Sequence, residues 1–452
     1  MADTSPSAPH PLAARGVAAI TALLGRDPPV GDLRLIFTNA ASLVGTTLVT
    51  SVLGVGFWWV AAHSFTPAAV GLGSAAISAI MLIATISTLG LGTFLMGELP
   101  RRAGQASSLV PTCLTIAGCV ALVLGGGFAL LSPRLSSGFA SLGNRPVHVA
   151  VFAFSAALTA VGLVMDQSLV GMLRAHLQLQ RNAIFAVVKL AVLALAGAAV
   201  GRSSGLSIYA AWGVGVALSL SVVTLVLTSQ GVRPKRPRFR LIRGLGRSPI
   251  EHHAFNLALQ VPGLVLPVVV AAVLTPAVNS RFYVALMIAG FVWMVPIALA
   301  TVLFPSAVGK PDTAPAKIRF TVCLSMLFGI AASIVVFFGA RRILEVFGSH
   351  YANGGAWPLR LLVLQVFPVA IKTHYAAVTR ISRRIGRAIP FVWGGTALEV
   401  ALAIVGLEIA GLVGLAVGWL AALLIEAVLM ARPVARGFGA DPLPDRTAKA
   451  EC

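Results

Sequence analysis

Residues Gly71 to Arg102 read GLGSAAISAIMLIATISTLGLGTFLMGELPRR. Before the two terminal arginines this stretch contains one charged residue, Glu98. A helix of about 20 largely apolar residues crosses the hydrocarbon core of a bilayer. The stretch therefore predicts a membrane-spanning helix that ends at a basic loop.

The whole chain has the same character. Of its 452 residues 58% are hydrophobic and 11% are charged, and the mean hydropathy is +0.92. Soluble domains are about half apolar and a quarter charged. The composition excludes a soluble enzyme, a nucleic-acid binder and a disordered chain, and it predicts an all-α polytopic membrane protein.

The net charge of +20 does not indicate nucleic-acid binding, because in a membrane chain excess Lys and Arg mark cytoplasmic loops. The four cysteines, Cys113, Cys119, Cys323 and Cys452, show neither a disulfide framework nor metal-ligand spacing. We expect no metal and no cofactor.

Twelve segments are long and apolar enough to span the membrane. They are residues 36–62, 70–97, 109–131, 148–173, 183–200, 206–228, 254–274, 282–304, 320–340, 359–379, 389–410 and 412–431. With the N-terminus inside, the inner connections carry 25 Lys and Arg and the outer ones 7. This asymmetry predicts cytoplasmic termini and a multi-pass protein of the plasma membrane, in bacteria the inner membrane.

The most basic connection, residues 229–253, separates two groups of six predicted spans. It divides the chain into a cytoplasmic lead, an N-lobe, this linker, a C-lobe and a cytoplasmic tail. Their residues are 1–35, 36–228, 229–253, 254–431 and 432–452.

An internal repeat supports two lobes. Thr66-Pro67-Ala68 recurs 209 residues later as Thr275-Pro276-Ala277. Four further residues recur at an offset of 206: Asp166, Arg174, Arg181 and Phe185 match Lys372, Arg380, Arg387 and Phe391. We therefore expect two six-helix lobes related by a pseudo-two-fold axis, forming a V-shaped alternating-access carrier.

Ionisable residues inside spans face protein or water and usually have partners. Asp166 and Lys189 both lie about 12 Å from the inner surface on consecutive helices, which predicts that they pair. The pair is either structural or a protonatable group of a transport cycle. Lys372 either pairs with Glu399 or faces the cavity as a point charge suited to a phosphate. Glu408 and Glu426, nearer the span ends, are expected to snorkel or to contact a neighbouring helix.

Polar side chains share one helical face in the first spans of both lobes. These candidates for a substrate-binding cavity are Asn39, Ser42, Thr46 and Thr50 in the first span and Asn256 and Gln260 in the seventh. The second span adds Ser74, Ser78, Thr85 and Thr88. The alternative is that such hydroxyls bond their own backbone or allow close helix packing.

Four stretches carry a family resemblance through their order along the chain. They are Gly71 to Arg102, Asp166 to Arg174 with Arg181 and Lys189 following, His253 to Val284, and Phe347 to Leu362. The chain resembles the polysaccharide-transporter branch, the Wzx-type oligosaccharide flippases, of the multidrug/oligosaccharidyl-lipid/polysaccharide exporter superfamily.

The resemblance implies a transporter that flips a lipid-linked oligosaccharide or glycolipid from the inner to the outer leaflet for cell-surface polysaccharide biosynthesis. A cationic cavity suits a phosphate-bearing head group, and the basic candidates are Lys372, Lys189, Arg174 and Arg34. The expected partners are the lipid-linked saccharide, membrane lipids and glycan-biosynthesis enzymes, and we expect a monomer.

Two alternatives remain open. A cation-coupled multidrug exporter of the same fold would use Asp166, the one buried acid of the N-lobe, for coupling, but the chain is only 7% aromatic. A membrane-embedded glycan-processing enzyme would need clustered outer residues, whereas His63, His148, His350 and Glu345 are scattered. We therefore expect that the protein is not an enzyme.

Overall fold

The computed structural model of the protein describes residues 52–101, 105–199, 202, 204–244, 246–308 and 313–436. These residues form helices joined by turns. The described chain begins with an apolar helix, Val52–Ser64. The first half continues with α3 (Pro67–Ser87), α4 (Leu91–Glu98), α5 (Ala106–Leu135), the 3-10 helix η2 (Ser137–Phe139), α6 (Ala140–Gly143), α7 (Pro146–Gly171), α8 (Ala175–Ala199) and α9 (Gly205–Ser229).

The second half follows the 3-10 helix η3 (Phe239–Gly244) and contains six helices. They are α10 (Arg247–Val273), α11 (Pro276–Val308), α12 (Ala314–Glu345), α13 (Ser349–Leu364), α14 (Val366–Ile381) and α15 (Ile385–Arg436). Each long helix overlaps at least one span predicted from the sequence.

Among the described residues, nine helices are long and apolar enough to cross a membrane. The pair α13 and α14, which meet at an angle of 41°, makes a tenth if it counts as one broken span. The prediction of an all-α, multi-pass membrane protein is confirmed. The number twelve stays a prediction, since most of the expected first span, 36–62, lies outside the described residues.

The predicted continuous span 70–97 is wrong, because the chain breaks between α3 and α4. Leu89 and Gly90 have positive φ angles of 48° and 78°. A Cβ on Gly90 would lie 2.7 Å from the carbonyl oxygen of Pro249. Glycine permits both the left-handed conformation and the close approach of the first turn of α10.

The long helix α15 reverses direction at Ala410 and Gly411, where the backbone angles are not helical. This break lies where the eleventh and twelfth predicted spans meet. A Cβ on Gly414 would lie 1.9 Å from the Gly406 carbonyl oxygen, and one on Gly418 would lie 2.0 Å from that of Leu402. The two arms are therefore antiparallel and pack backbone against backbone.

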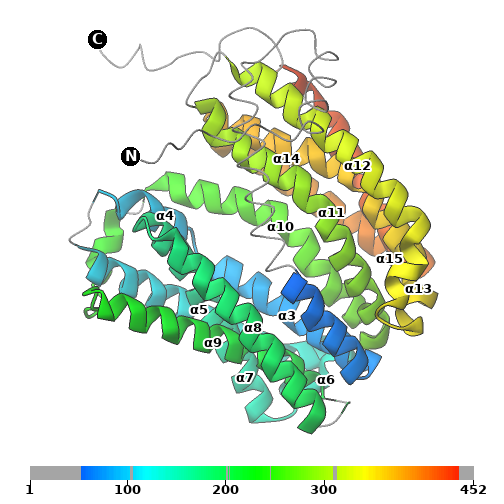
Figure 1. The fold of residues 1–452 in the computed structure, drawn as a ribbon, viewed down its shortest axis with the longest axis horizontal. Helices are drawn as coiled ribbons and strands as arrows, with labels where there is room; N and C mark the ends of the chain where they lie inside the picture. The colour runs from blue at the N-terminus through cyan, green and yellow to red at the C-terminus, as the bar shows by residue number, and fades with distance from the viewer. Residues whose placement is uncertain are drawn as a thin grey trace, which may run out of the picture.

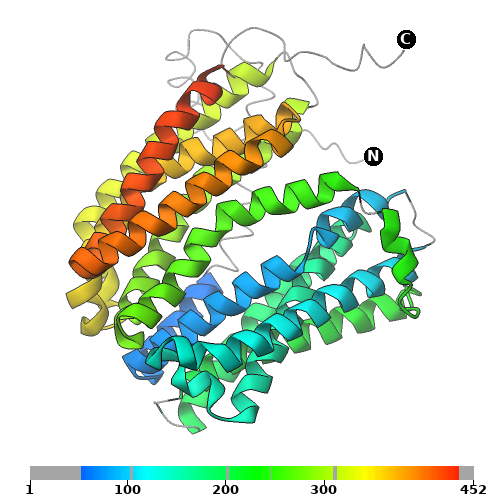
Figure 2. The same cartoon turned by 180° about the vertical axis from the view of Figure 1, so that it is seen from behind.

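Two groups of helices meet at an angle (Figures 1 and 2). We call the helix Val52–Ser64 together with α3–α9 the N-lobe, and α10–α15 the C-lobe. Helix α3 packs on α7 and α9 in its own lobe and on α10 and α11 across the lobe boundary. The boundary is therefore built chiefly on α3, α10 and α11.

The tightest contact between the lobes lies where α3 and α11 begin. A Cβ on Gly71 would lie 1.5 Å from the carbonyl oxygen of Pro276. Asn279 donates its amide hydrogens to the Gly71 carbonyl oxygen at 2.8 Å and to the Ser74 hydroxyl at 3.1 Å. The Trp58 and Tyr283 rings lie 4.5 Å apart between centroids. These contacts close the lobes together at this end.

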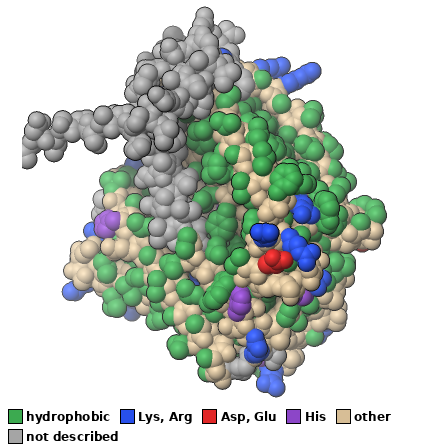
Figure 3. Space-filling view, turned by 45° about the vertical axis from the view of Figure 1, so that its right-hand side comes forward, with side chains coloured by type: hydrophobic (Ala, Val, Ile, Leu, Met, Phe, Trp, Pro, Cys, Tyr) green, Lys and Arg blue, Asp and Glu red, His purple; other side chains and the backbone are tan. Residues whose placement is uncertain are grey.

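The outer surface fits a lipid environment. Figure 3 shows hydrophobic side chains spread over the described face, with Lys and Arg side chains in separate groups. Many large apolar side chains are exposed, among them Phe338 at 78% and Val428 at 73%. In water such a surface would drive association, whereas in hydrocarbon it carries no such penalty.

Candidate functional site

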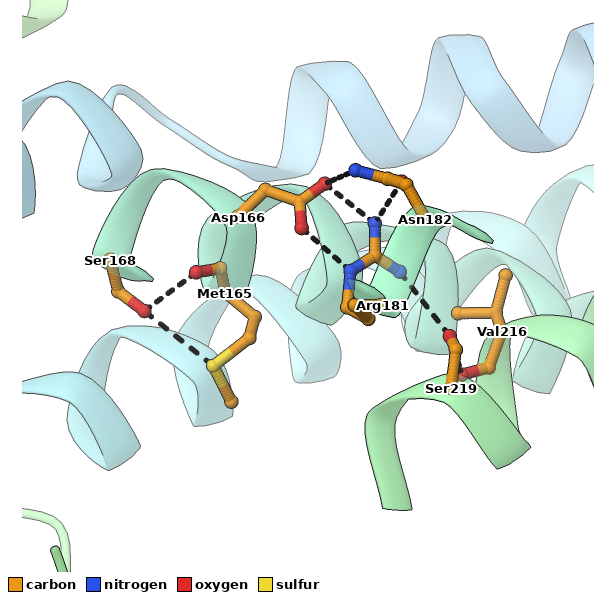
Figure 4. A network of polar contacts seen from close by, with 7 residues as sticks. All are labelled: Met165, Asp166, Ser168, Arg181, Asn182, Val216 and Ser219. Carbon is orange, nitrogen blue, oxygen red and sulfur yellow. Dashed lines mark hydrogen bonds and ion pairs between the residues drawn. The ribbon is translucent and has the colours of Figure 1, made fainter. Parts of the chain in front are cut away.

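Each lobe contains a buried cluster of charged side chains. In the N-lobe, Asp166 on α7 meets Arg181 on α8, and the two residues are 8% and 5% exposed. The guanidinium donates from Nε and Nη2 to the two carboxylate oxygens at 2.6 and 2.5 Å. Asn182 lies beside the pair, and Ser219 on α9 accepts from Nη1 of Arg181 at 3.4 Å (Figure 4). The network ties α7 to α8 and α9.

The predicted pairing of Asp166 with Lys189 is therefore wrong. Sequence reasoning placed Arg181 in an inner loop because it began the fifth span at residue 183. The helix begins at Ala175, so Arg181 lies nearly two turns inside it, on the face toward α7. Its planar fork matches both oxygens of a carboxylate, which a lysine ammonium does not.

Lys189 lies in a cage of aromatic rings. It is 8% exposed, and its ammonium nitrogen lies 5.2, 4.5 and 4.7 Å from the ring centroids of Phe57, Phe185 and Trp212. Such distances fall within the range of cation–π attraction. The rings belong to three helices, so the only local sequence signal was Phe185, one turn before the lysine.

In the C-lobe, Lys372 on α14 binds two carboxylates on α15. Its ammonium donates to Glu399 Oε1 and lies 2.9 Å from Glu426 Oε2. Trp419 Nε1 donates to the other oxygen of Glu399 at 2.6 Å. The three charged residues are 6%, 2% and 2% exposed. Of the two alternatives left open for Lys372, the structure shows the pair with Glu399 and not a free point charge in a cavity. Of the two left open for Glu426, it shows the contact with a neighbouring helix.

The hairpin of α15 brings the two glutamates together, because Glu399 lies on its first arm and Glu426 on its second. Gly395 leaves the space for Glu426, since a Cβ there would lie 2.5 Å from the carboxyl carbon. Sequence reasoning missed the third member because the contact depends on the register of the two arms. Among the described residues, the two carboxylates and one ammonium of the cluster leave one negative charge in excess unless a proton or cation is held.

The structure corrects the register of the internal repeat in this region. The α7–α8 and α14–α15 turns contain Leu173 and Arg383, with φ angles of 59° and 53°. The backbone bonds of Arg174 N to Leu169 O and of Arg384 N to Thr379 O are also equivalent. These pairs lie 210 residues apart, so the predicted offset of 206 is wrong by one helical turn. At the corrected offset Lys189 corresponds to Glu399.

The repeat at the starts of α3 and α11 is confirmed. The Thr66 hydroxyl accepts from Ala69 N at 3.3 Å, and the Thr275 hydroxyl accepts from Val278 N at 3.2 Å. In both cases proline follows as the first helical residue. Threonine caps before proline are favoured helix starts, so the two lobes begin these helices in the same way.

The predicted cavity residues divide into three groups. Asn39, Ser42, Thr46 and Thr50 lie outside the described residues. Asn256 accepts from Arg380 Nη2 at 2.6 Å, and the exposed Gln260 donates to the Asn256 carbonyl oxygen at 3.2 Å. Arg174 donates to Gln230 at the end of α9 at 2.7 Å, so it contacts its own lobe.

The hydroxyls of α3 chiefly bond the helix itself. Ser74 donates to the Gly71 carbonyl oxygen at 3.0 Å, Thr85 to Met81 at 2.7 Å and Thr88 to Thr85 at 2.9 Å. Ser74 also meets Asn279 across the lobe boundary. For this stripe the structure favours the alternative of backbone bonding and close packing over cavity lining.

Known proteins match this chain in its fold and not through a family model or a curated sequence. Neither a protein-family model nor a curated protein matches the sequence. An inward-facing structure of a multidrug resistance MATE family transporter of the MOP superfamily matches with a TM-score of 0.65 and 14% identity, over 86% of this chain and 94% of that one. A eukaryotic MATE transporter matches with 0.58 and 17%, over 90% and 99%. The Vibrio cholerae MATE transporter VcmN matches with 0.52 and 14%, over 90% and 95%.

These comparisons define the class of fold. The chain is an all-α polytopic membrane protein that folds as MATE transporters of the MOP superfamily do. The fold that we expected from the sequence resemblance is therefore supported. The polysaccharide-transporter branch is a finer assignment than the fold alone gives.

Proposed function

We propose that this protein is a membrane transporter that flips a lipid-linked oligosaccharide or glycolipid intermediate from the inner to the outer leaflet for cell-surface polysaccharide biosynthesis. The MATE-like fold supports a carrier. The tight Gly71–Pro276 contact between the lobes supports an alternating-access cycle, because such a contact must separate when the V opens the other way. The low aromatic content favours a saccharide over planar drugs as cargo.

The ion pair between Asp166 and Arg181 favours a flippase over an ion-coupled exporter. An acid that takes up a cation in each cycle must be open to that cation. Asp166, the acid expected to couple transport in the exporter alternative, is held by two hydrogen bonds from Arg181. Its charge is already compensated by a fixed cation, which favours a structural role and thus the flippase.

The second candidate, a cation-coupled multidrug exporter, is favoured by one observation. The Lys372–Glu399–Glu426 cluster has one carboxylate more than its single ammonium can neutralise. A buried excess charge is expensive in a membrane protein, so the cluster offers a place for one proton or cation. Drug efflux that is driven by an ion gradient and lost in a Glu426→Gln variant would select this candidate.

A glycan-processing enzyme has little support. The outer histidines proposed for such an activity are dispersed and individually engaged: His63 bonds Trp59 O, His148 bonds Ser141 O, and His350 bonds Ser280 and Ala277. The fold also matches carriers. These observations support the expectation that the protein is not an enzyme.

Native mass spectrometry of protein extracted gently from its own membrane tests the proposal. We expect a bound species with the mass of a polyprenyl phosphate or diphosphate carrying sugars, on a monomeric protein. A protein that carries only bulk phospholipid, and that moves cationic drugs under an ion gradient, would contradict the flippase and support the exporter.

A further inference from the structure

A pocket of about 380 Å³ opens at the basic end of the C-lobe, where α10 begins and α14 passes into α15. This volume lies within the range of small-ligand sites. Its lining combines charged, polar and apolar side chains: Ser248, Glu251, His252, Arg380, Ile381, Arg383, Ile385 and Gly386. None of these residues belongs to the buried Lys372 cluster.

Arg380 is the anchor of this pocket. Its guanidinium is half-buried, donates from Nη2 to Asn256, and lies 5.6 Å from the Phe255 ring centroid. No carboxylate pairs with it among the described residues. A guanidinium has five N–H donors, so Asn256 and Phe255 orient the group while most of its donors stay available. A partly buried, pre-oriented arginine without a counter-ion is suited to bind an anion.

The other charges of the pocket agree with an anionic ligand. Glu251, the one acid in the lining, is paired with Arg247 at 2.6 Å. Arg383 adds a second guanidinium on the α14–α15 turn. Ser248 lies in the first turn of α10, whose free N–H groups and dipole favour negative charge.

The equivalent turn of the N-lobe shows that these arginines are not needed for the backbone conformation. The α7–α8 turn has the same left-handed residue and the same hydrogen bonds. At the offset of 210 residues it has Val170 in place of Arg380 and Leu173 in place of Arg383. The turn therefore forms without them, and in the C-lobe the two arginines line a pocket.

We propose that this pocket binds a phosphoryl group, either on a lipid head group or as free phosphate, at the basic end of the C-lobe. Phosphate matches the forked donors of arginine and the N-terminus of a helix. The inference deepens the proposed function, on which its meaning for transport rests, because it names where a phosphate-bearing lipid would first be held.

Binding to the purified full-length protein in detergent tests the site without any transport. The probes are dioctanoyl phosphatidic acid, inorganic phosphate and, as an uncharged control, dioctanoylglycerol, measured by native mass spectrometry and thermal shift. Arg380→Gln removes the anchor. Arg384→Gln is the matched control, since it removes the same charge from an exposed residue of the same turn that does not line the pocket. Ser248→Glu places a carboxylate in the pocket and leaves Arg380 intact.

We expect phosphatidic acid to bind the wild-type protein and dioctanoylglycerol not to bind. Arg380→Gln and Ser248→Glu should each weaken this binding about tenfold or more, the scale of one charge-assisted hydrogen bond, whereas Arg384→Gln should leave it nearly unchanged. Equal affinity for inorganic phosphate would make free phosphate the ligand, and tighter binding of phosphatidic acid would make it a lipid head group.

The site would be refuted if neither phosphate probe binds, or if Arg384→Gln weakens binding as much as Arg380→Gln. Its failure is separable from failure of the proposed function. Selective phosphoryl binding without saccharide flipping would leave the site and remove the function. Saccharide flipping by a wild-type protein that binds neither phosphate probe would remove the site and leave the function.

Discussion

Asp166 and Arg181 illustrate how a charge is kept inside a membrane protein. Both side chains are nearly inaccessible, and each satisfies the other through two hydrogen bonds. Removing one partner of a buried pair costs about 3–5 kcal/mol, because it leaves a desolvated charge without compensation. The pair should therefore matter more for folding than for the transport cycle.

Arg181→Gln should lower the apparent melting temperature of the purified protein by several degrees, measured by tryptophan fluorescence in detergent. The double variant Asp166→Asn/Arg181→Gln removes both charges and should recover most of the loss. A single variant as stable as wild type, or a double variant no better than the single one, would show that the pair is not structural.

Lys372 leads to a similar prediction. In Lys372→Met two buried carboxylates remain with no ammonium between them, so the yield of monodisperse protein should fall severalfold in size-exclusion chromatography. Adding Glu399→Gln and Glu426→Gln should restore it. A normally folded Lys372→Met single variant would indicate instead that the lysine faces an open cavity.

Partners of charged residues were only partly predictable from the sequence. The sequence left Lys372 either paired with Glu399 or free in a cavity, and the structure shows the pair. Equal depth in the membrane predicted the wrong partner for Asp166, because the predicted fifth span began eight residues after the start of α8 and left Arg181 in a loop. The aromatic cage of Lys189 and the contact of Glu426 depend on helix rotation and register, which spacing alone does not fix.

At the level of elements, the hairpin of α15 depends on glycines where its arms touch. Gly418→Ala should destabilise the protein by about 1–3 kcal/mol, since its Cβ would overlap the Leu402 carbonyl oxygen. Gly394→Ala on the first arm is the control, because no atom lies within 4 Å of a Cβ there. In thermal unfolding, Gly394→Ala should have a melting temperature at or above that of the wild type, and Gly418→Ala should have one well below it. The reverse order would refute the backbone-to-backbone packing.

The ends of helices were predictable where an apolar stretch stops at charged residues or at a proline. Breaks inside an apolar stretch were harder to predict. The reversal at Gly411 was expected because two span lengths fit into one apolar stretch. The break at Gly90 was not, because it arises from the approach of Pro249, a tertiary contact. The repeat register failed by one helical turn because i and i+4 lie on the same face and give similar patterns.

At the scale of the molecule, the lobes are joined where Asn279 meets Gly71 and Ser74. In a background without the native cysteines, Ser74→Cys/Asn279→Cys should form a disulfide under mild oxidation. If this end must open during transport, oxidation should abolish transport and a reductant should restore it, with each single variant unaffected. A cross-linked protein that transports at the full rate would show that the lobes need not separate here.

The membrane class followed from composition, and the MOP-type fold was anticipated from the order of loose motifs along the chain. Cargo was not fixed in the same way, because the candidates in the first span lie outside the described residues and Lys372 proved to be neutralised. The basic pocket at Arg380 combines two stretches of the chain that are far apart in the sequence, residues 248–252 and 380–386, and no sequence pattern indicated it.

Flipping of a lipid-linked saccharide is the activity that we propose for this protein. The most direct measurement uses proteoliposomes that contain a fluorescent polyprenyl-diphosphate-linked sugar, with an impermeant quencher reporting how much label reaches the outer leaflet over time. We predict protein-dependent flipping of this lipid and none of an equally labelled phosphatidylcholine. Equal movement of both lipids, or movement of neither while cationic drugs are exported under an ion gradient, would rule out the proposed function.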